Sequence, residues 1–308
     1  MTNYLHKVLP PQYSHVNKVY CLLAATVFCA LPICSTEAAA ENILKYDGTT
    51  NIHGNAKTWA AKNEYDGIDI RVTGVDGGYY TDTTEALVLN NQTLNVKGKG
   101  KFVSIINTAQ NKQIDNNGGI YAKGGSTVNF TDVDSIYIAA IAGKEGGNDS
   151  TVISAKDPGR DLKGYTNIVN ISGTTVQLIG SIDVMHSLGS VFFNRNARHT
   201  VNAALSGSDS FWYGSAIGET DERTTVNLSL ADGATWIFNA GKSTLNAGGI
   251  IRNLKLDKGV VLFADAEVWE TYRKTVIKGT DYVLANYRDH NERYSQVEIR
   301  SLTGPGGV

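Results

Sequence analysis

A short phrase with an asparagine after a β-branched pair returns along the chain. One copy reads Thr127-Val128-Asn129-Phe130, three further copies centre on Asn170, Asn202 and Asn227, and a weaker copy surrounds Asn95. The copies are unevenly spaced, as expected when coils of about 20 residues carry loops of different lengths. Imperfect repetition of one short phrase favours a solenoid, in which each coil buries its inner face by stacking on its neighbours.

The segments around these phrases have the pattern of short β-strands. Val, Ile and Thr alternate with polar residues in runs such as 68–72, 126–130, 167–171 and 225–230, and Gly, Asn, Asp and Ser separate the runs. With only 5 Pro in 308 residues, most runs can pair on both edges, because proline cannot donate to a strand ladder. No helical period continues over any length.

We therefore expect an all-β chain that forms a right-handed parallel β-helix. In this fold the repeated Asn129, Asn170, Asn202 and Asn227 have a structural role, with amides stacked at a bend and bonded to the next coil. A longer echo aligns Ser135–Gly143 with Ser210–Gly218 and predicts that these segments occupy equivalent places in two coils. Sandwiches and propellers stay open as alternatives, but they explain the asparagine phrase less well.

The first forty residues have the pattern of a secretory signal peptide. Lys7 and Lys18 precede an apolar run over 19–34, and Ala38 and Ala40 supply the small residues that signal peptidase requires before a cut. The run is broken by Pro32 and is shorter than the about 20 residues of a membrane span. All 3 Cys lie in this leader, so the exported chain is expected to lack disulfides.

The charge balance argues against one class of partner. The chain has 28 basic and 30 acidic residues and a formal charge of −2, which excludes the basic footprint of a nucleic-acid binder. Its hydrophobic content of 42% is too high for a disordered chain of such low net charge.

No catalytic, metal or cofactor site is predicted. The four histidines that follow the leader, His53, His186, His199 and His290, are scattered and lack metal-ligand spacing. Asp183, His186 and Ser187 are too close together in sequence for a triad. The alternative is a β-helix enzyme that acts on polysaccharides, with the carboxylate pairs Asp132/Asp134 and Asp265/Glu267, whose spacing places each pair on one side of a strand.

Binding candidates are expected on loops and aromatic clusters. The segment 143–164 is the longest polar insertion, and Tyr79-Tyr80 and Phe211-Trp212-Tyr213 could present rings to sugars or proteins. Because alternate strand residues point inward, half of such rings are expected in the core instead. Trp236 is expected to pack inside the fold rather than to contact a ligand.

The last eighty residues resemble the passenger region of type V autotransporters. The resemblance rests on Ala234-Thr235-Trp236, Ser243-Thr244-Leu245 and Leu254-Lys255-Leu256, and on the end of the chain, 297–308, which is similar to the turn of a pertactin-like closing module. It implies a signal peptide at 1–40, a β-helix passenger at 41–250 and the start of the closing module at 251–308.

The resemblance also implies a function and a destination. Such a passenger is an exported adhesin or scaffold for host or surface interaction, with the inner- and outer-membrane export machinery and surface glycans or proteins as partners. The family carries a C-terminal β-barrel, which is expected beyond Val308; joined to it the passenger reaches the cell surface, and otherwise the periplasm. A polysaccharide-acting enzyme and a structural spacer remain the alternatives.

Overall fold

The computed structural model describes residues 42–51, 62–75, 83–109, 116–141, 149–156, 164–184, 197–217, 223–238, 249–263 and 297–305. They belong to one compact unit, Ala40–Ala264 with Asp281–Val308. A second unit, Met1–Ala39 with Asp265–Thr280, lies outside the described residues. The predicted leader with Ala38 and Ala40 lies outside them as well, so the signal peptide stays a prediction.

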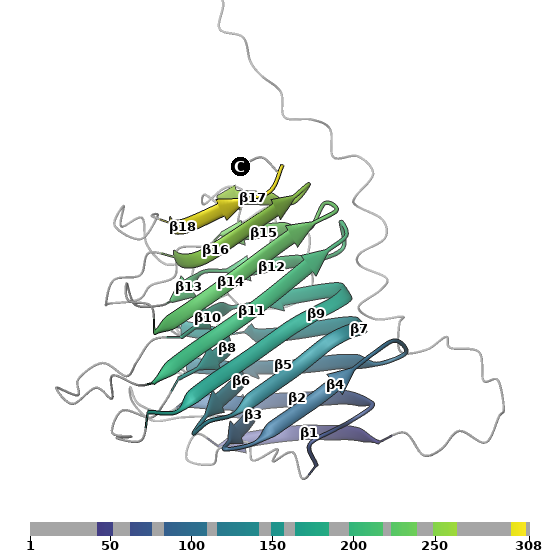
Figure 1. Cartoon of the computed structure of the whole chain (residues 1–308). Helices are drawn as coiled ribbons and strands as arrows, with labels where there is room; N and C mark the ends of the chain where they lie inside the picture. Colours follow the sequence, from purple (N-terminus) through teal and green to yellow (C-terminus); the bar gives the residue numbers. More distant parts are fainter. Residues whose placement is uncertain are drawn as a thin grey trace, which may run out of the picture. The chain divides into compact units, whose positions relative to one another are not determined.

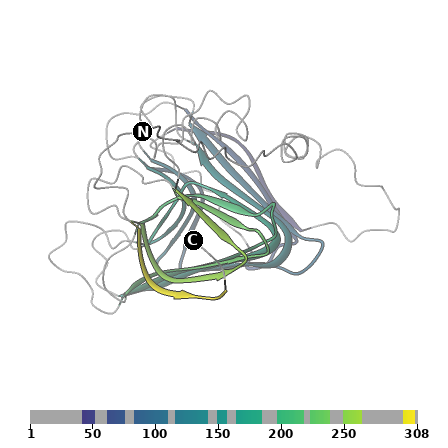
Figure 2. The same ribbon diagram turned by 90° about the horizontal axis from the view of Figure 1, so that it is seen from above.

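The regular secondary structure of the described part consists of β-strands alone, and neighbouring strands pair in parallel. One coil is made by β4 (Thr93–Lys97), β5 (Phe102–Ala109) and β6 (Asn116–Lys123), which lie on three different faces. In the next coil β7 (Thr127–Ile141) supplies the first two faces by itself and β8 (Asp149–Ala155) the third. Figure 2, which looks down the stack, shows the strands on three sides of a common interior.

The first face, here called the asparagine face, carries the repeated phrase. It is formed by β4, the first parts of β7 and β9 (Thr166–Ile179), and then β11 (Arg198–Ser206), β14 (Thr224–Ala231), β16 (Gly249–Asp257) and β18 (Val297–Thr303).

The second face begins lower in the stack. It is formed by β1 (Ile43–Asn51), β2 (Gly67–Val75), β5, the later parts of β7 and β9, and then β12 (Phe211–Gly214), β15 (Thr235–Phe238) and β17 (Val260–Phe263). The third face is a separate sheet of β3 (Thr83–Asn90), β6, β8, β10 (Ser181–Asp183) and β13 (Ala216–Ile217).

This arrangement confirms the parallel β-helix. In Figure 1 the chain crosses the near face from left to right and returns behind it as it climbs from β1 to β18, so the coil is right-handed. That hand is the one that twisted strands favour in parallel crossovers. The predicted boundary at residues 250 and 251 falls inside β16, which pairs with both β14 and β18; the division into passenger and closing module stays a prediction.

The interior is filled by the inward side chains of all three faces. On the second face Trp212 and Trp236 are fully buried and stack with ring centroids 5.0 Å apart and an interplanar angle of 5°. Their indole N–H groups donate to the backbone carbonyls of Gly180, at 2.9 Å, and Gly214, at 3.0 Å. The prediction that Trp236 packs inside the fold is confirmed, because each indole nitrogen finds a carbonyl one coil below.

One expectation about local structure is wrong, and a second holds with a shift of one residue. The segment 143–164 is not a single insertion, because β8 lies inside it and buries Val152, Ile153 and Ala155. Flanking Gly, Asp and Pro residues conceal this short apolar strand in the sequence. The later part of β7 and β12 occupy equivalent places on the second face, as the similarity of Ser135–Gly143 to Ser210–Gly218 predicts, but the alignment is shifted by one residue. Phe211 is level with Gln177 and Tyr137 rather than with Ile136.

Candidate binding face

The asparagines of the repeated phrase form a continuous ladder on the outside of the asparagine face. Asn129 donates from Nδ2 to Oδ1 of Asn95 at 2.9 Å, and Asn170 donates in the same way to Asn129 at 2.7 Å. Asn202 donates to Asn170 and Asn227 to Asn202, each at 2.7 Å. The bonds all run in one direction, which lets successive amides polarise one another.

The ladder follows from the register of the parallel strands. Asn129, Asn170, Asn202 and Asn227 lie level with one another in adjacent strands. Their chain neighbours, such as Val128 and Phe130, are fully buried, so alternation along the strand turns each asparagine outward. Parallel strands about 4.8 Å apart place identical side chains at hydrogen-bonding distance.

The expected position of these asparagines at a bend is wrong. Asn129 lies near the start of β7 but within it, and Asn202 and Asn227 lie in the middle of β11 and β14. The bends of this part of the coil occur farther along the chain, at residues with left-handed backbone such as Asp132, with φ 58°, and Asp232, with φ 51°. A regular ladder requires the constant spacing of paired strands, which a bend does not provide.

Sequence reasoning missed the upper member of the ladder, Asn253. It donates to Oδ1 of Asn227 at 2.6 Å and is level with it in β16. A signal was present, because Asn253-Leu254-Lys255-Leu256 repeats the alternation of Asn227-Leu228-Ser229-Leu230. At the lower end Asn95 donates to the backbone carbonyl of Asn63 at 3.0 Å, a contact that no side-chain pattern could indicate.

A shallow groove runs beside the ladder and is open to solvent. It has a volume of about 330 Å³ and spans five coils. Its outward side chains come from the asparagine row and from the next outward row on the same strands; they are Asn170, Asn202, Asn227, Asn253, Thr131, Ser172, Ala204, Ser229 and Lys255. The small Ala204 lies between Ser172 and Ser229 in adjacent strands, and the exposed surface of the groove is largely apolar.

The carboxylates considered for catalysis lie at a corner of the coil. Asp132 and Asp134 are both exposed where β7 passes from the asparagine face to the second face, at a shift in strand register. The Asp134 carboxylate accepts the backbone N–H of Gly100 at 3.1 Å, and the backbone N–H of Asp132 donates to Ser172 Oγ at 3.2 Å. Asp265 and Glu267 lie outside the described residues.

His199 and the ion pair Lys156–Asp183 contact groups that hold neighbouring coils together. His199 is fully buried, and its Nδ1 lies 3.1 Å from the amide nitrogen of Asn167, whose Oδ1 accepts backbone N–H groups from the coil below. Asp183 forms an ion pair with Lys156 across the third face. Burial lowers the pKa of Lys156, but the carboxylate of Asp183 and weaker contributions from Tyr121 and Glu85 outweigh it, so the pKa is raised.

The other residues predicted as metal-binding or ligand-binding candidates are buried or half-buried in the fold, or lie outside the described residues. Among the described residues no group of three or more His, Cys, Asp or Glu side chains could hold a metal ion. Trp212 and Tyr213 of the aromatic cluster are fully buried and Phe211 is half-buried, so this cluster packs rather than presents rings. Residues Tyr79, Tyr80, His53, His186, Ser187 and His290 lie outside the described part of the chain.

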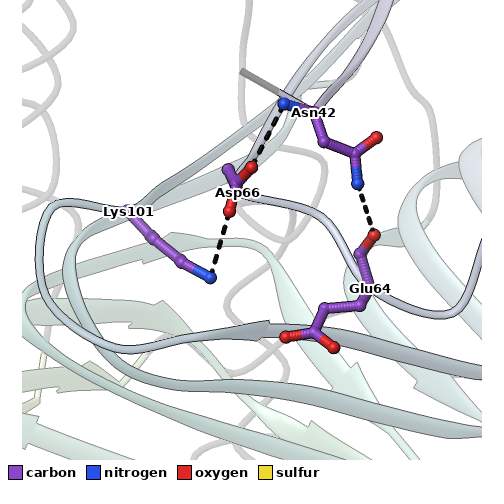
Figure 3. A network of polar contacts seen from close by, with 4 residues as sticks. All are labelled: Asn42, Glu64, Asp66 and Lys101. Carbon is purple, nitrogen blue, oxygen red and sulfur yellow. Dashed lines mark hydrogen bonds and ion pairs between the residues drawn. The ribbon is translucent and has the colours of Figure 1, made fainter. Parts of the chain in front are cut away.

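The lower coils are tied together by the exposed polar network in Figure 3. The Asp66 carboxylate accepts the backbone N–H of Asn42 at 3.1 Å and pairs with Lys101 Nζ at 3.2 Å, while the Asn42 amide donates to the backbone carbonyl of Glu64 at 2.8 Å. The Asn42 hydrogen bond, followed by Lys101, lowers the pKa of Asp66. Lys101 therefore belongs to a turn contact between coils.

No family model matches the sequence, no curated protein matches it, and no solved structure matches its fold. Within the described residues, no helix is both long and apolar enough to cross a membrane.

Proposed function

We propose that this chain is an exported surface protein, an autotransporter-like passenger that acts as an adhesin or surface-interaction scaffold. The observation that carries the proposal is the asparagine face: one outward residue type is kept through six consecutive strands beside an open groove. A stack of coils that share one core holds such a surface rigid, so little ordering cost opposes binding.

Sequence features support the same proposal. The leader pattern over 1–40 is suited to export, and the absence of cysteine after residue 34 suits a chain that crosses membranes before it folds. At the acidic corner pair, the Asp134 carboxylate accepts the Gly100 backbone N–H, a contact that ties the turn to the next coil.

The test is attachment to cells. Beads coated with the full-length protein are expected to be retained on host-cell monolayers or on sister cells, and beads coated with an unrelated protein of similar charge are not. Retention at the level of this control on every surface tested would defeat the adhesin proposal. Release of reducing sugar from polysaccharide by the purified protein would support the enzyme alternative instead.

A further inference from the structure

Within the described part of the chain, the four inner asparagines of the ladder use half of their amide hydrogen-bonding capacity. A primary amide has two N–H donors and two acceptor lone pairs. Asn170 uses one donor toward Asn129 and one lone pair toward Asn202, and the other inner asparagines, Asn129, Asn202 and Asn227, use their amides in the same way. Each of these amides thus keeps one donor and one acceptor side by side, a pair that two neighbouring hydroxyl groups can satisfy together.

The charge and the apolar surface of the groove restrict the chemical class of its ligand further. Lys255, at the upper end, is the one charged residue among those that line the groove. An anionic polymer would need a cation beside each coil, because charge-assisted contacts supply the strong hydrogen bonds to carboxylates. The exposed surface of the groove is largely apolar, and the side chains that line it carry the amides of the ladder and the hydroxyls of Ser172 and Ser229. Sugar rings have this division, with apolar C–H faces and a polar rim.

The spacing of the coils fits the repeat of a glycan better than the repeat of an extended peptide. Adjacent coils repeat every about 4.8 Å, whereas an extended peptide turns the same side outward every second residue, at about 6.6 Å. A peptide that follows the stack would lose step with the asparagines after two coils. A pyranose ring with its linking oxygen is nearly as long as the distance between adjacent coils, so successive sugar units stay level with successive asparagines.

We propose that the groove beside the asparagine ladder binds a neutral, extended polysaccharide that follows the stack with about one sugar unit per coil. The sugar hydroxyls pair with the remaining amide donors and acceptors of Asn170, Asn202 and Asn227. This inference rests on the binding role proposed above and names the ligand class of the same face. Several weak contacts along one rigid row add up because later contacts are intramolecular.

The experiment is titration calorimetry of the full chain with neutral hexasaccharides of glucose, mannose, xylose and galactose, and with an oligogalacturonate of equal length. At least one neutral hexasaccharide is expected to bind. Ala204→Leu fills the hollow between Ser172 and Ser229 without changing charge or touching the ladder. It is expected to weaken binding by about tenfold or more, because displaced hydrogen bonds change affinity on this scale.

Thr174→Leu is the matched control, because Thr174 is exposed on β9 but does not line the groove. It should leave the affinity unchanged, and circular dichroism should show both variants folded. Failure of all neutral hexasaccharides to bind at millimolar concentration, tighter binding of the galacturonate, or equal weakening by both substitutions would overturn the glycan inference. Bead attachment to cells that persists in any of these cases leaves the adhesin proposal standing, whereas failed attachment with intact glycan binding defeats the adhesin proposal alone.

Discussion

The two sides of the same strands of the asparagine face follow different rules. On the outside one residue type, asparagine, occupies six levels of the stack from Asn95 to Asn253. On the inside, the residue after each asparagine changes size from coil to coil; it is Val96, Phe130, Ile171, Ala203, Leu228 and Leu254, all buried. Burial is non-directional and needs only a filled volume, whereas a hydrogen-bond ladder needs the same donor and acceptor at every step.

The largest effect is expected inside the stack, at Trp236 of the second face, whose ring fills the same interior. Trp236→Ala removes a fully buried ring that stacks on Trp212 and meets Phe238 edge-on at 5.6 Å, and it leaves the Gly214 carbonyl without the indole donor. We expect the free energy of unfolding in urea, followed by circular dichroism, to fall by about 3–5 kcal/mol.

Trp236→Phe is the matched variant, since it keeps an aromatic ring but loses the indole N–H. Its free energy of unfolding should fall by clearly less than that of Trp236→Ala. A smaller loss for Trp236→Ala than for any asparagine of the ladder would reverse the proposed order of inside and outside.

A medium effect is expected on the outside, at Asn202. Asn202→Ala breaks two ladder bonds, to Asn170 and from Asn227, and should lower the free energy of unfolding by about 1–2 kcal/mol. Asn253→Ala breaks one such bond, to Asn227, and should cost about half as much.

Thr200→Ala, on the same strand and outward side, is the control and should change the stability little. Equal losses for Asn202→Ala and Thr200→Ala would mean that the ladder does not stabilise the stack. In that case only a binding role would account for the repeated asparagine.

The smallest effect concerns the ion pair of the third face and its pH dependence. Because the folded-state pKa of Lys156 is raised above 10.5, the pair contributes stability below that pH and loses it as the pH rises through the folded-state pKa. Lys156→Met should therefore flatten the alkaline fall of the unfolding free energy that begins as the pH passes 10.5.

Tyr137 provides the control for this titration. Burial raises the pKa of its phenol above 10.0, so the contribution of Tyr137 to the unfolding free energy also falls as the pH rises. Tyr137→Phe removes this part of the alkaline fall. An alkaline slope unchanged in Lys156→Met but flattened in Tyr137→Phe would assign the pH dependence to the phenol instead of the ion pair.

Sequence reasoning reached the fold through features that are local. Alternation around Val128, Asn129 and Phe130 indicated a strand and its outward residue, and the repetition of the phrase indicated stacked coils. It failed where local patterns are weak, as at β8, or where two similar segments differ by one residue in register, as between Ser135–Gly143 and Ser210–Gly218. A one-residue slip exchanges the two sides of a strand, so similarity of composition cannot decide register.

The sequence by itself determined that the chain is an all-β solenoid and that the repeated asparagines share one position in successive coils. Only the tertiary structure decided that they lie in mid-strand, that the ladder continues to Asn253 and ends on the Asn63 carbonyl, and that a groove opens beside Ala204. The reason is physical: side-chain alternation is encoded within a few residues. Which strands lie level depends on loops of different lengths, since the bonded asparagines are 34, 41, 32, 25 and 26 residues apart.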